Sequence, residues 1–281
     1  MSSILGVILS DQYILANEYI AYSKLTDGYW QICIRDLESR KETQLTSTQT
    51  DKRKPVWWKP QEKLIFKTNL GAIDSVKIHG GAERAFLPDL DDISTPVFSL
   101  DFKKMIYAKY RFDPVDDSDL WMVHVDGSGK KLLVGGPGTQ YDACWSPDGK
   151  QLVYVSRETK GIHNIFIIDL ATGAKRRLTE NNVYNVSPAW SPDAKKIVYS
   201  SNVGGGYDIW LMNADGGNKK RLTTSPELEI NPTWSPDGKL IAFTRFNNNR
   251  LEVWTVDPGT GKVKPLIQEE TDCRDPVWFE N

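Results

Sequence analysis

The stretch that decides the fold is residues 188–223, which read PAWSPDAKKIVYSSNVGGGYDIWLMNADGGNKKRLT. Its opening motif, Trp190-Ser191-Pro192-Asp193, returns almost unchanged at Trp145 and again at Trp234. The three tryptophans are spaced by 45 and then 44 residues. Self-similarity with a fixed period of this size is the signature of a repeat architecture, so we treat the chain as a series of similar units.

Weaker copies of the unit extend in both directions. The same phase places aromatic residues at Trp278, Phe98 and Trp57, with a weak match at Tyr13. An apolar triplet such as Ile197-Val198-Tyr199 follows each strong copy of the aromatic, and a further apolar run, a Gly/Asp turn and a short closing run complete the unit. Short β-branched or aromatic runs separated by turn residues are typical of strands, and each unit contains four of them.

Units of 40–45 residues with four strands are typical of propeller blades. We therefore predict an all-β fold, a six-bladed β-propeller with four antiparallel strands per blade, forming one domain over residues 1–281. The blades are expected at approximately 11–50 together with 274–281, 51–90, 91–136, 137–180, 181–224 and 225–270.

The closure of the ring is predicted from the segment Pro276-Val277-Trp278, which has the phase of a first strand but is followed by no further strand. If this segment joins the first blade, the ring is closed by pairing of the two termini, and two free sheet edges disappear. Tyr13-Ile14-Leu15 competes for the same place, and residues 4–9 are a further strand candidate.

The Trp-Ser-Pro-Asp-Gly-Lys unit, with its following Asp-Ile-Trp-Leu-Met-Asn-Ala-Asp-Gly-Gly run, resembles the WD40-like repeat of TolB-type β-propellers. The strong copies cover roughly residues 141–267. The resemblance implies a propeller that serves as a docking platform for protein partners.

Composition narrows the classes of function. The 281 residues carry 35 basic and 37 acidic side chains, so the chain lacks the basic excess of a nucleic-acid binder. No apolar run approaches the ~20 residues of a membrane span, and we expect a soluble protein. The N-terminus has no secretory signal, so we expect a cytoplasmic location, or a periplasmic or extracellular one if the segment was trimmed.

Several local motifs have ordinary structural explanations. Cys33, Cys144 and Cys273 form no CxxC pair, and we expect buried thiols, with no cofactor required. The basic runs 175–177 and 219–221 fall in outer strands, where charge prevents edge pairing. Asp113, Asp116, Asp117 and Asp119 lie in the longest insertion, 111–119, and leave calcium binding as an open alternative. The histidines at 79, 124 and 163 are expected to be ordinary turn or strand residues, none of them at the channel mouth.

The residues that vary from unit to unit predict the binding site. In a propeller, the links into the first strand of each blade converge on one mouth of the central channel, beside the loops between second and third strands. The residue before each repeat proline, and its neighbours, should face that mouth. The candidate ligand- or partner-binding residues are Arg53, Lys54, Thr95, Tyr141, Asp142, Ser187, Asn231, Arg274 and Asp275.

We therefore predict a non-catalytic scaffold that docks a protein segment or peptide at this polar mouth. The alternative is a metal-dependent hydrolase of lactonase type, with a divalent cation held by Asp142, Asn231 and Asp275, although Lys54 would place a competing positive charge there. A third possibility is a propeller that accompanies a separate peptidase. The oligomeric state has no signature in the sequence.

Overall fold

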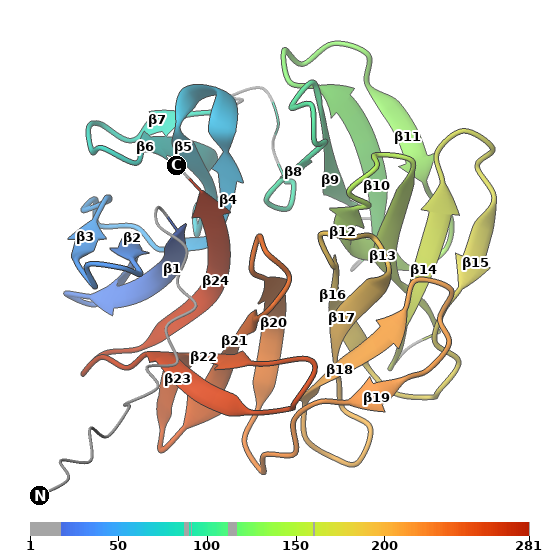
Figure 1. Cartoon of the computed structure of the whole chain (residues 1–281). Helices are drawn as coiled ribbons and strands as arrows, with labels where there is room; N and C mark the ends of the chain where they lie inside the picture. The colour runs from blue at the N-terminus through green and yellow to red at the C-terminus, as the bar shows by residue number, and fades with distance from the viewer. Residues whose placement is uncertain (1–17, 87–89, 91, 112–116, 160, 281) are drawn as a thin grey trace, which may run out of the picture.

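The protein is an all-β propeller, with its sheets arranged around a common centre (Figure 1). The structure, a computed structural model, describes residues 18–86, 90, 92–111, 117–159 and 161–280. The two candidate strands near Tyr13 and at residues 4–9 lie outside the described residues. Within the described part, the one helical element is a short 3-10 turn, η1 (Lys59–Gln61).

The closing sheet joins distant parts of the chain. Its strand order is β24 (Cys273–Glu280), β1 (Glu18–Thr26), β2 (Tyr29–Asp36) and β3 (Glu42–Gln44). Trp278 pairs with Ile20 in antiparallel register, which confirms that the C-terminal strand completes the first blade. Lys24 and Arg35 of this sheet also bind Glu269, so charged contacts reinforce the closure across 245 residues of chain.

Three further sheets have four antiparallel strands each. The first consists of β4 (Lys52–Trp58), β5 (Lys63–Thr68), β6 (Ile73–Lys77) and β7 (Arg84–Ala85). The second consists of β16 (Asn185–Trp190), β17 (Lys196–Ser201), β18 (Asp208–Asn213) and β19 (Lys220–Arg221). The third consists of β20 (Glu229–Trp234), β21 (Ile241–Asn247), β22 (Arg250–Val256) and β23 (Val263–Ile267).

The remaining eight strands form one continuous sheet. Its first half contains β8 (Val97–Phe98), β9 (Lys104–Arg111), β10 (Asp117–His124) and β11 (Lys131–Val134). Its second half contains β12 (Thr139–Trp145), β13 (Gln151–Thr159), β14 (Ile162–Asp169) and β15 (Lys175–Arg177). The two halves are joined by a single parallel pair, Ser118 with Thr139.

The repeated tryptophans pack between neighbouring sheets. Trp190 of β16 packs with Val153 and Ile167 of the preceding sheet and with Tyr199 of its own. The indole nitrogen of Trp234 donates a hydrogen bond of 3.2 Å to the carbonyl of Ala189 in the neighbouring sheet. Trp58 is likewise buried between sheets, beside Phe86 at 5.0 Å between ring centroids, and is no surface contact.

The Ser-Pro-Asp turn has the same geometry in each strong copy. Ser191 donates a hydrogen bond of 2.6 Å to Asp193, and the Lys195 amide donates one of 3.1 Å to the same carboxylate. These bonds lower the pKa of Asp193. The next residue needs a left-handed backbone, which Gly149 and Gly238 adopt easily, whereas Ala194 adopts it at φ +58°.

The outer strands are charged and exposed as the sequence predicts, whereas only two of the three cysteines are fully buried. β15 and β19 lie at sheet edges with every side chain exposed, as expected for charged edge strands. Cys33 and Cys273 are buried, but Cys144 is only partly buried, because it lines a cavity in the centre of the ring.

Candidate functional site: the mouth of the central channel

A β-bulge occurs near the start of the innermost strand of five blades. The strand register shifts between Arg53 and Val56, and the same shift recurs in β12, β16, β20 and β24. Each bulge contains the mouth residue predicted from the sequence and the residue after it, which is proline in four of the five. A proline has no N–H to give to a strand ladder, so a bulge accommodates it without loss of a hydrogen bond.

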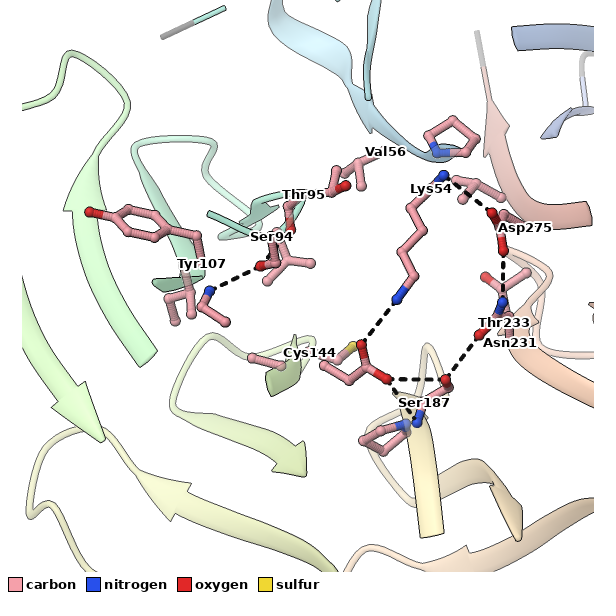
Figure 2. A pocket seen from close by; sticks show the side chains of 18 of the residues that line it. Lys54, Val56, Ser94, Thr95, Tyr107, Cys144, Ser187, Asn231, Thr233 and Asp275 are labelled. Atoms are coloured by element: carbon pink, nitrogen blue, oxygen red, sulfur yellow. Dashed lines mark hydrogen bonds and ion pairs between the residues drawn. The ribbon is translucent and has the colours of Figure 1, made fainter. Parts of the chain in front are cut away.

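The mouth residues themselves have left-handed backbones. The φ angles are +53° at Lys54, +47° at Asp142, +52° at Ser187, +55° at Asn231 and +55° at Asp275. This conformation is unfavourable for residues other than glycine and recurs at sites where the surrounding structure holds it for a purpose. A bulge redirects its side chain. These five side chains meet in the centre of the ring (Figure 2).

The five residues form a closed circuit of hydrogen bonds. The Ser187 backbone N–H donates to Asp142 Oδ2 at 3.2 Å, and the Ser187 hydroxyl donates to the Asn231 side-chain oxygen at 3.0 Å. The Asn231 amide nitrogen donates to Asp275 Oδ1 at 2.7 Å. The Lys54 backbone N–H lies 3.4 Å from Asp275 Oδ2, and the Lys54 ammonium completes the circuit at 3.2 Å from Asp142 Oδ1.

Lys54 spans the channel to reach its partner. Figure 2 shows the Lys54 side chain extended across the opening. Its ammonium lies 3.2 Å from Oδ1 of the Asp142 carboxylate. Asp142 and, more weakly, Asp275 raise the pKa of the Lys54 ammonium and outweigh the opposing effect of removal from water. The ammonium is therefore a fixed internal cation within the ring of polar groups.

Thr95 departs from the pattern. It precedes β8, which has only two residues, and the left-handed residue nearest before that strand is Asp92. The Thr95 side chain still lines the same space, and its hydroxyl oxygen is buried without a hydrogen-bond partner among the described residues. Thr95 therefore takes no part in the circuit of the other five residues. The Lys54 side chain extends past Thr95 and contacts Asp142 directly.

Two connected cavities occupy the mouth. The inner one has a volume of about 240 Å³ and lies against the apolar walls of Val56, Val97 and Leu120. The outer one has a volume of about 900 Å³ and opens over the polar circuit. The structure brings all nine sequence-predicted residues together here: Arg53, Lys54, Thr95, Tyr141, Asp142, Ser187, Asn231, Arg274 and Asp275.

The sequence analysis missed the contribution of the second and third strands. Lys67, Tyr110 and Arg157 lie near the outer ends of β5, β9 and β13 and line the larger cavity. His163, near the start of β14, lines it too, so the expectation that no histidine lies at the mouth was wrong. These residues could have been predicted from the topology, because the connections between second and third strands lie at the same end of the ring as the mouth.

An aromatic cluster occupies one side of the mouth. The Tyr141 hydroxyl is hydrogen-bonded to His163 Nδ1, and the His163 ring stacks on Tyr184 with centroids 4.5 Å apart. Burial raises the pKa of Tyr141. Burial also lowers the pKa of His163, and Arg157 adds to that effect. The folded chain therefore favours a neutral imidazole here.

The polar side chains at the mouth are already hydrogen-bonded to one another. The oxygens of Asp142, Asn231 and Asp275 that were predicted as metal ligands are engaged in the circuit and with Lys54. Among the described residues, no group of three or more His, Cys, Asp or Glu side chains has the proximity to hold a metal ion.

In the acidic insertion, the carboxylates of Asp117 and Asp119 form ion pairs with the Arg111 guanidinium, with N–O distances of 3.3 and 3.4 Å. Asp113 and Asp116 lie outside the described residues. Among the helices that the structure describes, none is long and apolar enough to cross a membrane.

Comparison with known proteins supports the resemblance. A stretch of 63 residues, 22% of this chain and 14% of the relative, is 41% identical to the "Tol-Pal system protein TolB" of Polaromonas sp. strain JS666. The structure is similar to TolB from Acinetobacter baumannii, with a TM-score of 0.80 and 21% identity over 92% of this chain and 66% of that one. A putative TolB from Agrobacterium tumefaciens gives a TM-score of 0.74 at 19% identity, with coverage of 94% and 97%.

These structural likenesses, at such low identity, concern the fold, and the chain spans a small part of the Polaromonas protein. The family match is broader. Residues 72–279 match the family described as the TolB beta propeller domain, PD40, which is most of the chain. On the strength of that match and of its own repeat, the chain belongs to the TolB beta propeller domain family.

Proposed function

We propose that this protein is a non-catalytic binding module that docks a protein segment or peptide at the mouth of its central channel. The observation that carries the proposal is the combination of a cavity of about 900 Å³, lined by Lys54, Asp142 and Asp275, with the hydrogen-bonded circuit of five left-handed residues to which those three belong. Strained backbones held in place by a network provide a preorganised surface, which lowers the cost of ordering on binding. The volume lies at the upper end of the range for ligand sites and suits a short extended peptide.

The blade count and the domain organisation form part of this proposal. The two halves of the eight-stranded sheet share only one residue pair, so we count them as two blades and the ring as six. Each blade then contributes one residue to the mouth, within its innermost strand or, for Thr95, just before it: Lys54, Thr95, Asp142, Ser187, Asn231 and Asp275. A single domain organised in this way presents one composite surface to a partner.

A metal-dependent hydrolase is the second candidate, and the carboxylates of Asp142 and Asp275 are what favour it. Against it, the Lys54 ammonium lies 3.2 Å from Asp142 and competes with a cation for that oxygen. His163 is a candidate base, but its Nδ1 is engaged by the Tyr141 hydroxyl. We therefore place docking before hydrolysis.

The experiment is selection of a peptide-display library against the immobilised full chain. Each selected peptide is retested on Tyr110→Ala and Arg157→Ala, two substitutions in the mouth, and on Leu132→Ser and Lys220→Ala, two on outer strands. Docking at the mouth predicts peptides whose affinity falls with the first pair and not with the second. Peptides that are equally sensitive to both pairs, or selection of none above background, would contradict it.

A further inference from the structure

The charge at the mouth differs in sign from the charge of the whole chain. Among the described residues that line the larger cavity, five are basic and three are acidic: Arg53, Lys54, Lys67, Arg157 and Arg274 against Asp51, Asp142 and Asp275. The full chain has a formal net charge of −2. A concave site lined by one sign of charge concentrates the local potential, so this mouth attracts anions although the protein as a whole does not.

The three acidic groups are already matched by basic ones. Asp142 has Lys54 at 3.2 Å, and Asp51 has Arg53 at 3.9 Å. Asp275 has Arg274 at 3.1 Å and is almost fully buried, with 4% of its surface exposed. In each pair the basic side chain is more exposed than the acidic one, at 46% against 26% for Arg53 and Asp51, 52% against 20% for Lys54 and Asp142, and 20% against 4% for Arg274 and Asp275. A ligand therefore meets the cations more readily than the carboxylates.

Two of the arginines are held in place by an aromatic ring. The guanidinium carbons of Arg53 and Arg274 lie 5.4 and 5.6 Å from the centroid of Trp30. An arginine positioned in this way loses less freedom when it binds a carboxylate, and its planar group suits a bidentate contact. Arg53 keeps 46% of its side chain exposed, so its donors remain accessible.

Lys67 is arranged similarly on the adjacent wall. Its ammonium donates a hydrogen bond of 2.7 Å to the carbonyl of Ile93 and lies 4.9 Å from the ring centroid of Tyr110. Burial lowers the pKa of this lysine. An anionic group that enters the cavity would favour the charged form of Lys67, which couples anion binding to this side chain.

Exposed apolar side chains lie at the same end of the ring as the cationic cavity. Of the seven large hydrophobic side chains that are exposed among the described residues, five lie at this end, and we call them the rim: Leu70, Tyr110, Tyr184, Leu228 and Phe246. They lie at the ends of second strands, in the connection between a second and a third strand, or in the connections that lead into first strands, and Tyr110 also lines the cavity. Exposed apolar residues gathered around a polar centre are typical of a protein-docking surface.

We propose that the mouth recognises an acidic segment of a partner protein, whose carboxylates pair with Arg53, Arg274 and Lys67 while its apolar side chains pack on the rim. This inference rests on the proposed docking function and adds the chemistry of the partner. The apolar rim favours a polypeptide over a sugar acid or an inorganic anion, because those ligands have no apolar side chains to cover it.

The test uses three display libraries of equal diversity that differ only in a fixed central pair, Asp-Glu, Asn-Gln or Lys-Arg. The acidic library is expected to give most of the binders. The best acidic peptide and its Asn/Gln isostere are then titrated against the full chain at low and high salt. We expect the acidic peptide to bind about tenfold more tightly at low salt, and the advantage to shrink at high salt.

Matched variants locate the effect. Arg53→Gln and Lys67→Gln should each weaken the acidic peptide about tenfold and leave its isostere unchanged, whereas Lys220→Gln on outer strand β19 should change neither. The salt dependence of the acidic peptide's affinity for the wild-type chain tests the electrostatic contribution to binding without any substitution in the protein. Trigalacturonate, a polyanion without apolar side chains, should compete only weakly.

The outcomes separate the two proposals. Mouth binding by neutral or basic peptides would overturn the acidic partner and leave the docking function standing. Competition by trigalacturonate as strong as that of the peptide would assign the mouth to sugar acids instead. No mouth binder from any of the three libraries would overturn both proposals.

Discussion

The ammonium nitrogen of Lys54 lies 3.2 Å from Oδ1 of Asp142, although the two residues are 88 positions apart and belong to different sheets. The contact joins β4 to β12 past the strands β8 to β11 that lie between them in the ring. It also decides the character of the site, because an internal cation at this point balances carboxylates that would otherwise repel each other or recruit an external cation.

Replacement of Lys54 by Met should therefore lower stability and create a response to calcium. About half of the Lys54 side chain is exposed, so we expect a loss of only about 1 kcal/mol, or roughly 2 °C in Tm. Addition of calcium should recover part of that loss in the variant and leave the wild type unchanged. Lys150→Met, which removes an exposed lysine 3.9 Å from Asp148, is the control and should show neither effect.

Two of the repeated tryptophans should respond differently to the same substitution. Trp234 and Trp190 are similarly buried, but the indole nitrogen of Trp234 bonds to Ala189 whereas that of Trp190 has no partner among the described residues. Trp234→Phe should cost about 1 kcal/mol more than Trp190→Phe, because it removes the hydrogen bond that the indole donates to the Ala189 carbonyl. Urea denaturation of both variants measures the difference; equal losses would refute a role for the hydrogen bond.

Ala194→Gly should stabilise the protein. Ala194 holds φ +58° at a turn where Gly149 and Gly238 hold +70° and +72°. Relief of this conformation should raise the free energy of unfolding by up to about 1 kcal/mol. The lost contacts of the methyl group reduce that gain slightly. The reciprocal Gly149→Ala should destabilise by a similar amount through its backbone alone, since its new methyl group would have open space around it. Thermal denaturation of both variants checks the opposite signs.

His163 should make stability depend on pH. Burial holds its pKa below the ordinary value of about 6.5 in the folded chain. The neutral imidazole therefore contributes stability above pH 6.5 that is lost as the pH falls through the lowered folded value. His163→Gln should flatten the fall in Tm between pH 7.5 and 5.5, while His79→Gln, at a side chain that is 66% exposed, should leave the wild-type slope.

The closure of the ring can be tested at Phe279. Its ring lies 5.3 Å from that of Tyr19 and 4.7 Å from that of Trp57, and only 2% of its surface is exposed. Phe279→Ala should cost about 3–5 kcal/mol, because it empties the contact between the closing strand and the next blade. Phe246→Ala makes the same chemical change at an exposed site and should stay within about 0.5 kcal/mol of the wild type by urea denaturation.

The repeat made most of the fold predictable. Trp145, Trp190 and Trp234 mark equivalent positions, so one copy of the motif indicates where strands, turns and buried wedges lie in the others. The position before the repeat proline predicted the mouth residues for the same reason. Thr95 shows the limit of this reasoning, because Thr95-Pro96 matches the motif while the backbone adopts its left-handed turn at Asp92 instead.

The contacts across the ring could not be predicted in the same way. Lys67, Tyr110, Arg157 and His163 lie on second and third strands, where the repeat fixes the backbone but the side chain changes from blade to blade. Which of these side chains meet depends on the diameter and curvature of the ring, and a linear spacing does not contain that information.

The closing sheet has a consequence for how the protein is made. Lys24 and Glu269, which meet across that closure, are 245 residues apart, so a ribosome that adds 5–20 residues per second needs roughly 12–50 s to supply the second after the first. During that interval β1 waits with one edge unpaired, while the intervening blades emerge and fold. Synthesis of this ring therefore leaves one strand edge exposed for a long time. Some cellular factor, or the charged residues of the edge itself, must protect that edge until β24 has been synthesised and pairs with it.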